Sequence, residues 1–97
     1  MGQEIHKKTV VNITKILDLL RENGELHIRG ISKALDLNPF IVSNIVNNHI
    51  DFFVNSRAID QFGIRLRLIG LKSGKEETTV EDVLKYIKVK QRIRGKI

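Results

Sequence analysis

The chain has 97 residues, of which 41% are hydrophobic, and it contains no cysteine. This length suits one domain with a modest core, and the missing cysteines exclude disulfides, thiol chemistry and cysteine-bound zinc. No apolar run reaches membrane-spanning length and the N-terminus lacks a signal-peptide layout. We therefore expect a cytoplasmic protein with no membrane partner.

The net charge of +6 is unevenly distributed along the chain. Residues 1–84 contain 11 basic and 11 acidic residues, whereas residues 85–97 contain six basic residues and no acid. A neutral body with a basic final segment is compatible with a nucleic-acid partner, although the charge alone does not identify one.

The chain divides into a polar N-terminal tail (1–9), a central domain (10–75) and a basic amphipathic helix (76–97). A first helix is predicted from Val10 to Asn23, because apolar residues recur there at helical spacing and Gly24 suits the left-handed position after a helix. The next four residues, 25–28, are predicted to be extended and able to pair as a strand.

Residues 28–49 have the pattern of two short helices joined by a tight turn. Helical spacing runs up to Leu37 and resumes after the turn on one face, which carries Val42, Ile45, Val46 and His49. Asn38 can cap the second helix, and Pro39 fits its first position, where no backbone donor is needed. Asp36 in the turn tolerates the left-handed conformation. These features predict a helix-turn-helix.

The predicted outward face of the second helix is polar but uncharged, since residues 38–50 contain no charged side chain. Asparagine can contact adenine through its amide, and serine can bind a base or a phosphate. The candidate contact residues on this face are Phe40, Ser43, Asn44, Asn47 and Asn48. An exposed aromatic side chain suits a protein partner equally well.

After residue 51 the pattern changes from helical to alternating, which predicts a two-stranded hairpin. A three-residue loop, Gln61-Phe62-Gly63, would oppose Asp60 to Ile64. In that register the inward face of the hairpin contains Val54, Ser56, Ala58, Ile64, Leu66 and Leu68. The outward face then gathers three arginines, Arg57, Arg65 and Arg67, which face either phosphate or water.

This order of helix, short strand, helix, turn, helix and hairpin resembles the winged helix-turn-helix domain of small archaeal and bacterial transcriptional regulators. The resemblance covers residues 10–71 and includes the sequence ISKALDLNPFIVSNIV. It implies a mainly α fold with a small antiparallel β-hairpin, with helix 38–49 in the major groove of double-stranded DNA and the wing, 52–69, on the backbone or minor groove. The contact residues that it implies are Lys33, Asn38, Phe40, Ser43, Asn44, Asn47, Asn48, Arg57, Arg65 and Arg67.

The final helix is predicted to begin with a capping box formed by Thr78 and Glu81 and to end near Arg94. One apolar stripe, Val80, Val83, Leu84 and Ile87, should dock onto the domain. A second stripe, Tyr86, Val89 and Ile93, is assigned either to a homodimer interface or to packing on the first helix through Val11 and Leu19. A third face carries Lys85, Lys88 and Arg92, which contact DNA flanks or keep this end soluble.

No feature of the sequence indicates catalysis, a cofactor or a metal. There is no phosphate-binding glycine loop and no nucleophile–base constellation, and His27 has no potential metal ligands at suitable spacing. The sequence therefore predicts a non-enzymatic, sequence-specific DNA-binding protein, a homodimeric transcriptional regulator. The alternative is a winged-helix protein-interaction module in a transcription or replication assembly.

Overall fold

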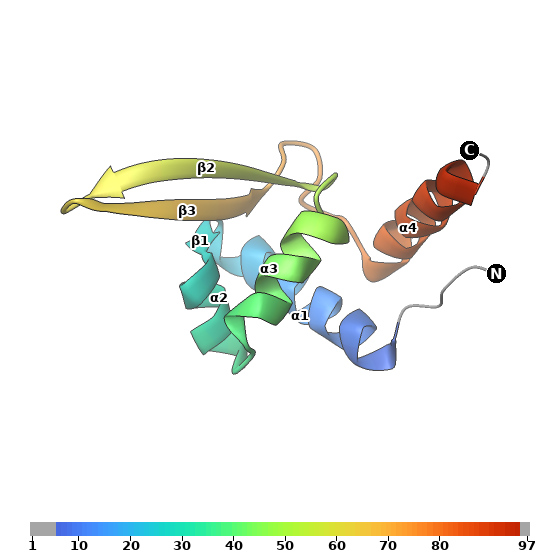
Figure 1. The fold of residues 1–97 in the computed structure, drawn as a ribbon, viewed down its shortest axis with the longest axis horizontal. Coiled ribbons are helices and arrows are strands. Elements are labelled where there is room, and N and C mark those ends of the chain that lie inside the picture. The colour runs from blue at the N-terminus through green and yellow to red at the C-terminus, as the bar shows by residue number, and fades with distance from the viewer. Residues whose placement is uncertain (1–5, 96–97) are drawn as a thin grey trace.

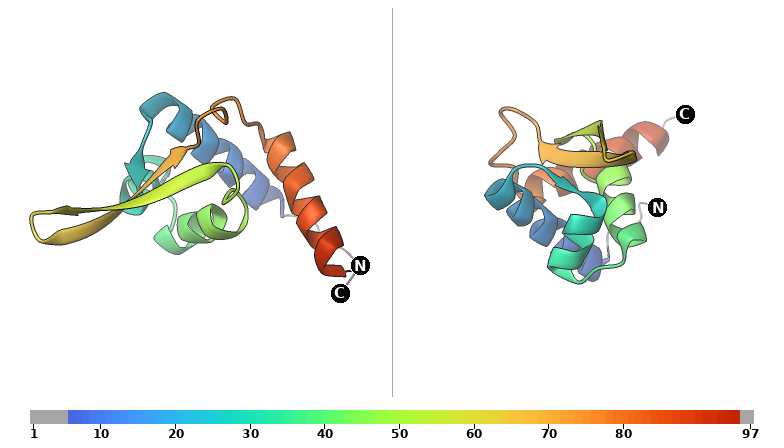
Figure 2. Two further views of the ribbon diagram at one scale, coloured as in Figure 1. Left: turned by 90° about the horizontal axis from the view of Figure 1, so that it is seen from above. Right: turned by 90° about the vertical axis from the view of Figure 1, so that its left-hand side faces the viewer.

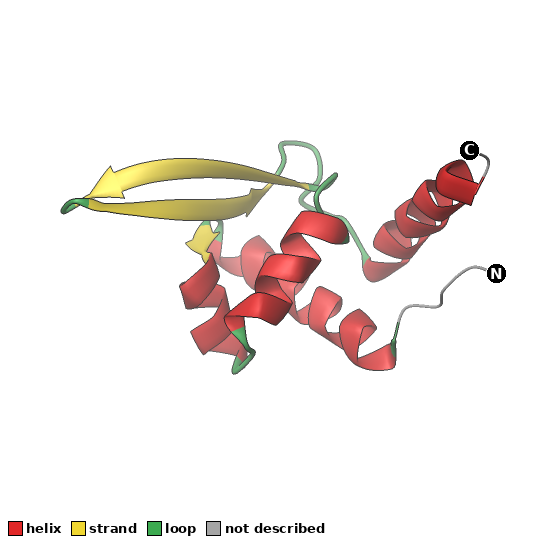
Figure 3. Cartoon of the chain, viewed as in Figure 1, coloured by secondary structure: helices red, strands yellow, loops and turns green. Residues whose placement is uncertain are grey.

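The structure, a computed structural model, describes residues 6–95 and the side chains of residues 6–93. This part of the chain contains four helices and one three-stranded antiparallel sheet (Figures 1 and 3). The elements are α1 (Lys7–Asn23), β1 (Leu26–His27), α2 (Ile28–Leu35), α3 (Pro39–Asn48), β2 (Val54–Gln61), β3 (Ile64–Leu71) and α4 (Val80–Gly95). The predicted α+β class is confirmed. Residues 1–5 of the predicted tail and residues 96–97 of the predicted last helix lie outside the described residues.

The molecule is elongated because the β2–β3 hairpin projects beyond the helices. Its extents are 47 × 26 × 25 Å. Figure 1 shows the hairpin tip at one end and α4 at the other, with α3 crossing in front of α1, and the view from above in Figure 2 shows the same separation. None of the helices in the described range is long and apolar enough to cross a membrane.

Helix α1 supplies the centre of the core. Its buried face consists of Ile13, Ile16, Leu17 and Leu20, and the helix ends at Asn23 as predicted. Gly24 has a φ of 78°, and its N–H donates to the Leu20 carbonyl. The predicted start at Val10 was too late. Helix α1 begins at Lys7 because the His6 side chain accepts a hydrogen bond from the Lys8 N–H, which caps a polar first turn that the apolar pattern could not reveal.

The two central helices and their turn are confirmed in detail. Asp36 ends α2 in the left-handed conformation (φ 53°, ψ 49°). The Asn38 side-chain oxygen accepts from the Phe40 N–H at 2.8 Å, and Pro39 occupies the first turn of α3. The buried Ser32 hydroxyl donates to the Leu37 carbonyl, which closes the turn from inside. These local hydrogen bonds therefore fix the residue at which α3 begins.

The predicted extended link forms β1, which pairs with β3. Leu26 lies opposite Ile69 and His27 opposite Leu68. The His27 Nδ1 atom accepts from the Gly30 N–H at 2.8 Å and so caps α2. A Cβ atom at position 30 would come within 3.2 Å of the His27 ring, so this cap favours glycine there. His27 thus has a local structural role.

The predicted hairpin register was wrong by one residue. Gln61 pairs with Ile64, and the loop contains only Phe62 and Gly63, both at positive φ (52° and 75°). Such two-residue turns match the right-handed twist of the strands. Burial does not oppose this choice, because most of β2 is exposed and both faces of the projecting hairpin meet solvent. The turn, rather than an apolar face, determines the register.

The corrected register changes the assignment of faces. Only the base of the hairpin, at Val54 and Ile69, covers the core. This inner face continues outward through Ser56, Ala58, Asp60, Arg65 and Arg67, with Asp60 directly opposite Arg65. The outer face contains the other alternating residues, Arg57, Ile59, Ile64, Leu66 and Leu68. The predicted cluster of three arginines is therefore wrong, because Arg57 lies on the opposite face from Arg65 and Arg67.

Helix α4 docks through the first predicted stripe, with Val83 and Ile87 buried. The predicted capping box is shifted by one residue. Thr78 is buried and its hydroxyl donates to the Lys75 carbonyl, so Thr79 caps the helix and exchanges hydrogen bonds with Asp82. The Arg21 guanidinium donates to the Glu76 and Thr78 carbonyls, which fastens the preceding loop to α1.

The turn geometry makes a prediction about stability. Phe62 is 95% exposed and adopts a left-handed conformation that bulky residues disfavour. Phe62→Asn should therefore raise the free energy of unfolding by about 0.5–1 kcal/mol, measured by urea denaturation. As a control, the β-branched variant Phe62→Val should lower it. An asparagine variant less stable than the parent would contradict this description of the turn.

Candidate nucleic-acid interface

Helix α3 presents a polar face to solvent and an apolar face to the core. Val42, Ile45 and Val46 are buried, as predicted, and His49 is half-buried at the end of the helix. The outward residues are Phe40, which is 84% exposed, the half-buried Ser43, and the exposed Asn44, Asn47 and Asn48. This part of the predicted site is thus brought together on one surface.

The polar side chains of α3 are hydrogen-bonded to one another. Asn47 Nδ2 donates to Ser43 Oγ at 3.2 Å, and Asn48 Nδ2 donates to Asn44 Oδ1 at 2.6 Å. Both pairs are four residues apart, which places them one turn apart on the same face. These contacts restrict the amide rotamers, so the α3 surface is ordered before any ligand binds.

Arg67 joins the hairpin to this surface. Its Nε donates to Ser56 Oγ at 2.6 Å and its Nη2 donates to Asn47 Oδ1 at 2.8 Å. The guanidinium therefore lies against α3 although it comes from β3. The sequence places no charge on α3 itself, and this contact places an exposed positive charge beside its asparagines. Arg65 lies on the same strand face, farther toward the hairpin tip.

Arg57 has a different environment. On the outer face of the sheet its Nε and Nη2 donate to the two Glu25 carboxylate oxygens at 2.8 and 2.7 Å. Glu25 reaches it across Gly70, where an added Cβ atom would come within 2.9 Å of the Glu25 side chain. The hydrogen bond from Arg57 and its charge lower the pKa of Glu25, and the same contact raises the pKa of Arg57. Arg57 does not converge with Asn47.

The remaining predicted cations are exposed but scattered. Lys33 lies near the end of α2. Lys88 and Arg92 lie on the side of α4 opposite the buried Val83 and Ile87, so they point away from the body. Lys85 is also exposed and lies beside the start of α4, away from α3. Among the α4 cations whose side chains the structure describes, Lys90 reaches the end of α3. Its ammonium lies 3.4 Å from the Asn48 carbonyl oxygen and 3.5 Å from Asp51 Oδ1.

The predicted second stripe of α4 is split between two environments. Tyr86 stacks on Phe52 of its own chain with ring centroids 5.1 Å apart, and it meets Phe53 edge-on at 5.6 Å. Val89 and Ile93 remain 51% and 61% exposed. Val11 on α1 is also 51% exposed, which does not match the fold-back arrangement in which α1 would cover this stripe.

Several residues with clear roles were missed from the sequence. Ser56 holds Arg67, Glu25 pairs with Arg57, and Asp51 accepts from both Tyr86 and Lys90. The inner face could have been predicted from the sequence of β3, because Arg65 and Arg67 alternate in step with Ile69, the residue buried at the base of the hairpin. Ser56 pairs with Ile69 and therefore lies on this face too.

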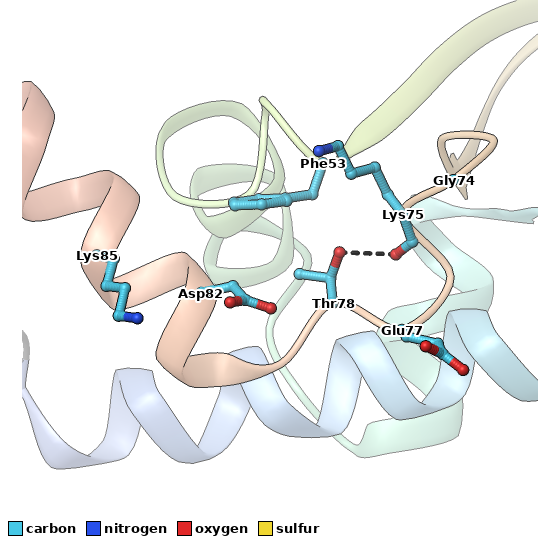
Figure 4. A pocket seen from close by; sticks show the side chains of 7 residues that line it. All are labelled: Phe53, Gly74, Lys75, Glu77, Thr78, Asp82 and Lys85. Carbon is cyan, nitrogen blue, oxygen red and sulfur yellow. Dashed lines mark hydrogen bonds between the residues drawn. The ribbon is translucent and has the colours of Figure 1, made fainter.

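An open hollow of about 420 Å³ lies beside the start of α4 (Figure 4). It is lined by Phe53, Gly74, Lys75, Glu77, Thr78, Asp82 and Lys85. Its polar groups serve the helix cap, because hydrogen bonds from Thr79 and the charges of Lys85 and Lys75 lower the pKa of Asp82. The hollow therefore lies where the loop joins α4, and its polar groups have a structural role there. Across residues 6–95, no group of three or more His, Asp or Glu side chains is arranged to hold a metal ion.

Comparison with known proteins adds no assignment: the chain matches no protein-family model and no curated protein sequence.

His49 makes stability depend on pH at the end of α3. Burial and the Lys90 charge lower the pKa of His49 below its usual range. The unfolded chain therefore binds this proton more readily. The contribution of the neutral His49 side chain to the free energy of unfolding is complete above the unfolded pKa of about 6.5 and is lost as the pH falls through the folded pKa.

We expect the free energy of unfolding to fall below pH 6.5 with a His49 slope of at most about 1.4 kcal/mol per pH unit. Urea denaturation of the parent and of His49→Gln should show a shallower decline for the variant. Parallel profiles for the parent and His49→Gln would exclude this contribution.

Proposed function

We propose that the protein is a winged helix-turn-helix protein that binds double-stranded DNA and regulates transcription without catalysis or a cofactor. In this proposal α3 enters the major groove, and the β2–β3 hairpin follows the neighbouring backbone or minor groove. The observation that supports it most is the Arg67–Asn47 hydrogen bond, because it unites the positive inner face of the hairpin with the ordered polar face of α3.

The element order and the exposure pattern support the same proposal. Helix α3 contributes three buried residues to the core that it shares with α1 and α2, while Phe40, Asn44 and Asn47 on its opposite face are exposed. Serine and asparagine supply hydrogen-bonding groups for base edges, and arginine supplies the charge that attracts phosphate. Arg57, Lys85, Lys88 and Arg92 lie away from this surface, so the proposal assigns them no direct contact.

A salt titration tests DNA binding. Binding to a random-sequence duplex should weaken steeply with salt, because bound cations release counterions from phosphates. Arg65→Ala should make the slope of log K against log salt shallower by about one unit. Arg57→Ala is the matched control on the opposite face, and its slope should stay close to that of the parent. No measurable duplex binding at low salt would exclude the proposal.

We further propose that the protein acts as a homodimer through α4. Val89 and Ile93 are about one helical turn apart and half or more exposed, whereas Tyr86 is already packed within its own chain. A two-fold pairing of α4 would cover these side chains and present two copies of α3 to a palindromic site.

The dimer proposal predicts a change in mass. Sedimentation of Val89→Glu/Ile93→Glu should give half the mass of the parent, because two carboxylates would have to be buried in the interface. Lys88→Glu, a charge change on the outward side of the same helix, should leave the dimer mass unaltered. If the parent sediments as a monomer, the dimer proposal is excluded.

A second candidate function is protein binding, favoured by the apolar outer face of the hairpin. Phe62 and Ile64 are 95% and 61% exposed, and they continue into the cross-strand pair of Ile59 and Leu66. Exposed apolar residues gathered in this way often mark interaction surfaces. A protein-interaction module would show no salt-dependent duplex binding, so the same titration separates the two candidates.

A further inference from the structure

We infer that Arg67 contacts guanine in the major groove, as the arginine that α3 itself lacks. The inference rests on the proposed function and names the base that this surface selects. From the sequence, the hairpin arginines face either phosphate or water, and the α3 asparagines are candidates to contact adenine. The hydrogen bonds around Arg67 favour a different division of roles.

One edge of the Arg67 guanidinium is used within the protein and the other is open. Nε and Nη2 donate along one edge to Ser56 and Asn47. The opposite edge consists of Nη1 and the second hydrogen of Nη2. Within the described residues, 6–95, this edge forms no hydrogen bond, and the side chain is exposed. Two parallel donors of this kind fit the O6 and N7 acceptors of guanine.

The two contacts also hold the guanidinium in place before binding. An arginine side chain normally loses rotamer freedom when it binds a base, and this loss weakens the interaction. Here Ser56 holds Nε from β2 and Asn47 holds Nη2 from α3, so the open edge is presented beside the α3 surface. The Arg67 side chain has therefore already lost part of its rotamer freedom in the free protein.

Asn47 is already engaged through both ends of its amide, which bears on its contact with adenine. That contact needs the amide oxygen and nitrogen together. A guanidinium can only donate, so Asn47 must direct its oxygen toward Arg67, and its nitrogen donates to Ser43. The Asn44 oxygen accepts from Asn48. Arg67 therefore supplies the two parallel donors of this surface, and guanine, unlike adenine, offers two acceptors in the major groove.

The test begins with selection of preferred sites from duplexes with a randomised core of about 20 base pairs, long enough for two half-sites. The affinity of the parent, Arg67→Ala and Arg67→Lys is then measured with each base at every selected position. Arg57→Lys is the control on the outer face. Thermal unfolding checks that each variant is folded.

We expect one guanine in each half-site at which the parent discriminates roughly tenfold or more against other bases. Both Arg67 variants should lose discrimination at this position and keep it elsewhere. Arg67→Lys should retain the affinity for random duplex, because it keeps the charge but lacks the paired donors. Replacing this guanine by 7-deazaguanine, which lacks the N7 acceptor, should weaken the parent and leave Arg67→Lys unaffected.

Other results would overturn the inference while leaving DNA binding intact. One such result is that Arg67→Ala weakens binding to all sequences equally and lowers the salt slope, because Arg67 would then contact phosphate. Full guanine preference in Arg67→Lys, or no preferred guanine in the parent, would also overturn it. Absence of duplex binding by the parent at low salt is a separate result and removes the proposed function itself.

Discussion

The candidate surface depends on the register of one hairpin. The Phe62-Gly63 turn pairs Gln61 with Ile64, and strand alternation then places Arg67 on the face that continues from Ile69. A shift of one residue in β3 would move Arg67 to the outer face and leave α3 without a cation beside its asparagines. A two-residue turn with positive φ at both positions therefore controls the electrostatics of a helix that is remote from it in sequence.

The helices supply rigidity rather than charge. The α1 face made by Ile13, Ile16, Leu17 and Leu20 is almost fully buried, and α3 packs onto it through Val42, Ile45 and Val46. Caps at Asn38 and Asp36 set where α3 begins, and bonds within α3 order its asparagines. Because none of these residues is cationic, the positive charge beside the α3 asparagines comes from the hairpin, where Arg65 and Arg67 share the inner face.

Much of the helical fold could be predicted, because its signals are local. The limits of α3, the left-handed Asp36 and the stop at Gly24 each follow from one or two residues whose conformational preferences are strong. The register of the hairpin could not be derived from burial, because its projecting part is solvated on both faces. The N-terminal turn of α1 was missed because it is polar. The Thr79 cap was missed because the neighbouring Thr78, with Glu81, matches the capping-box pattern. Contacts such as Arg67–Asn47 and Arg57–Glu25 join distant segments, so they required the tertiary structure.

In the proposed DNA-binding dimer, the contact between α4 and the end of α3 would bear on the length of DNA between the two subunits. Lys90 lies near the Asn48 carbonyl and Asp51, and the Tyr86 hydroxyl donates to the same aspartate. These bonds join α4 to the last turn of α3 without a flexible linker. Two chains paired through α4 would therefore hold their α3 helices at a set spacing and angle. An extra base pair between half-sites rotates one of them by about 35°, which such a rigid pair could follow only by twisting the DNA.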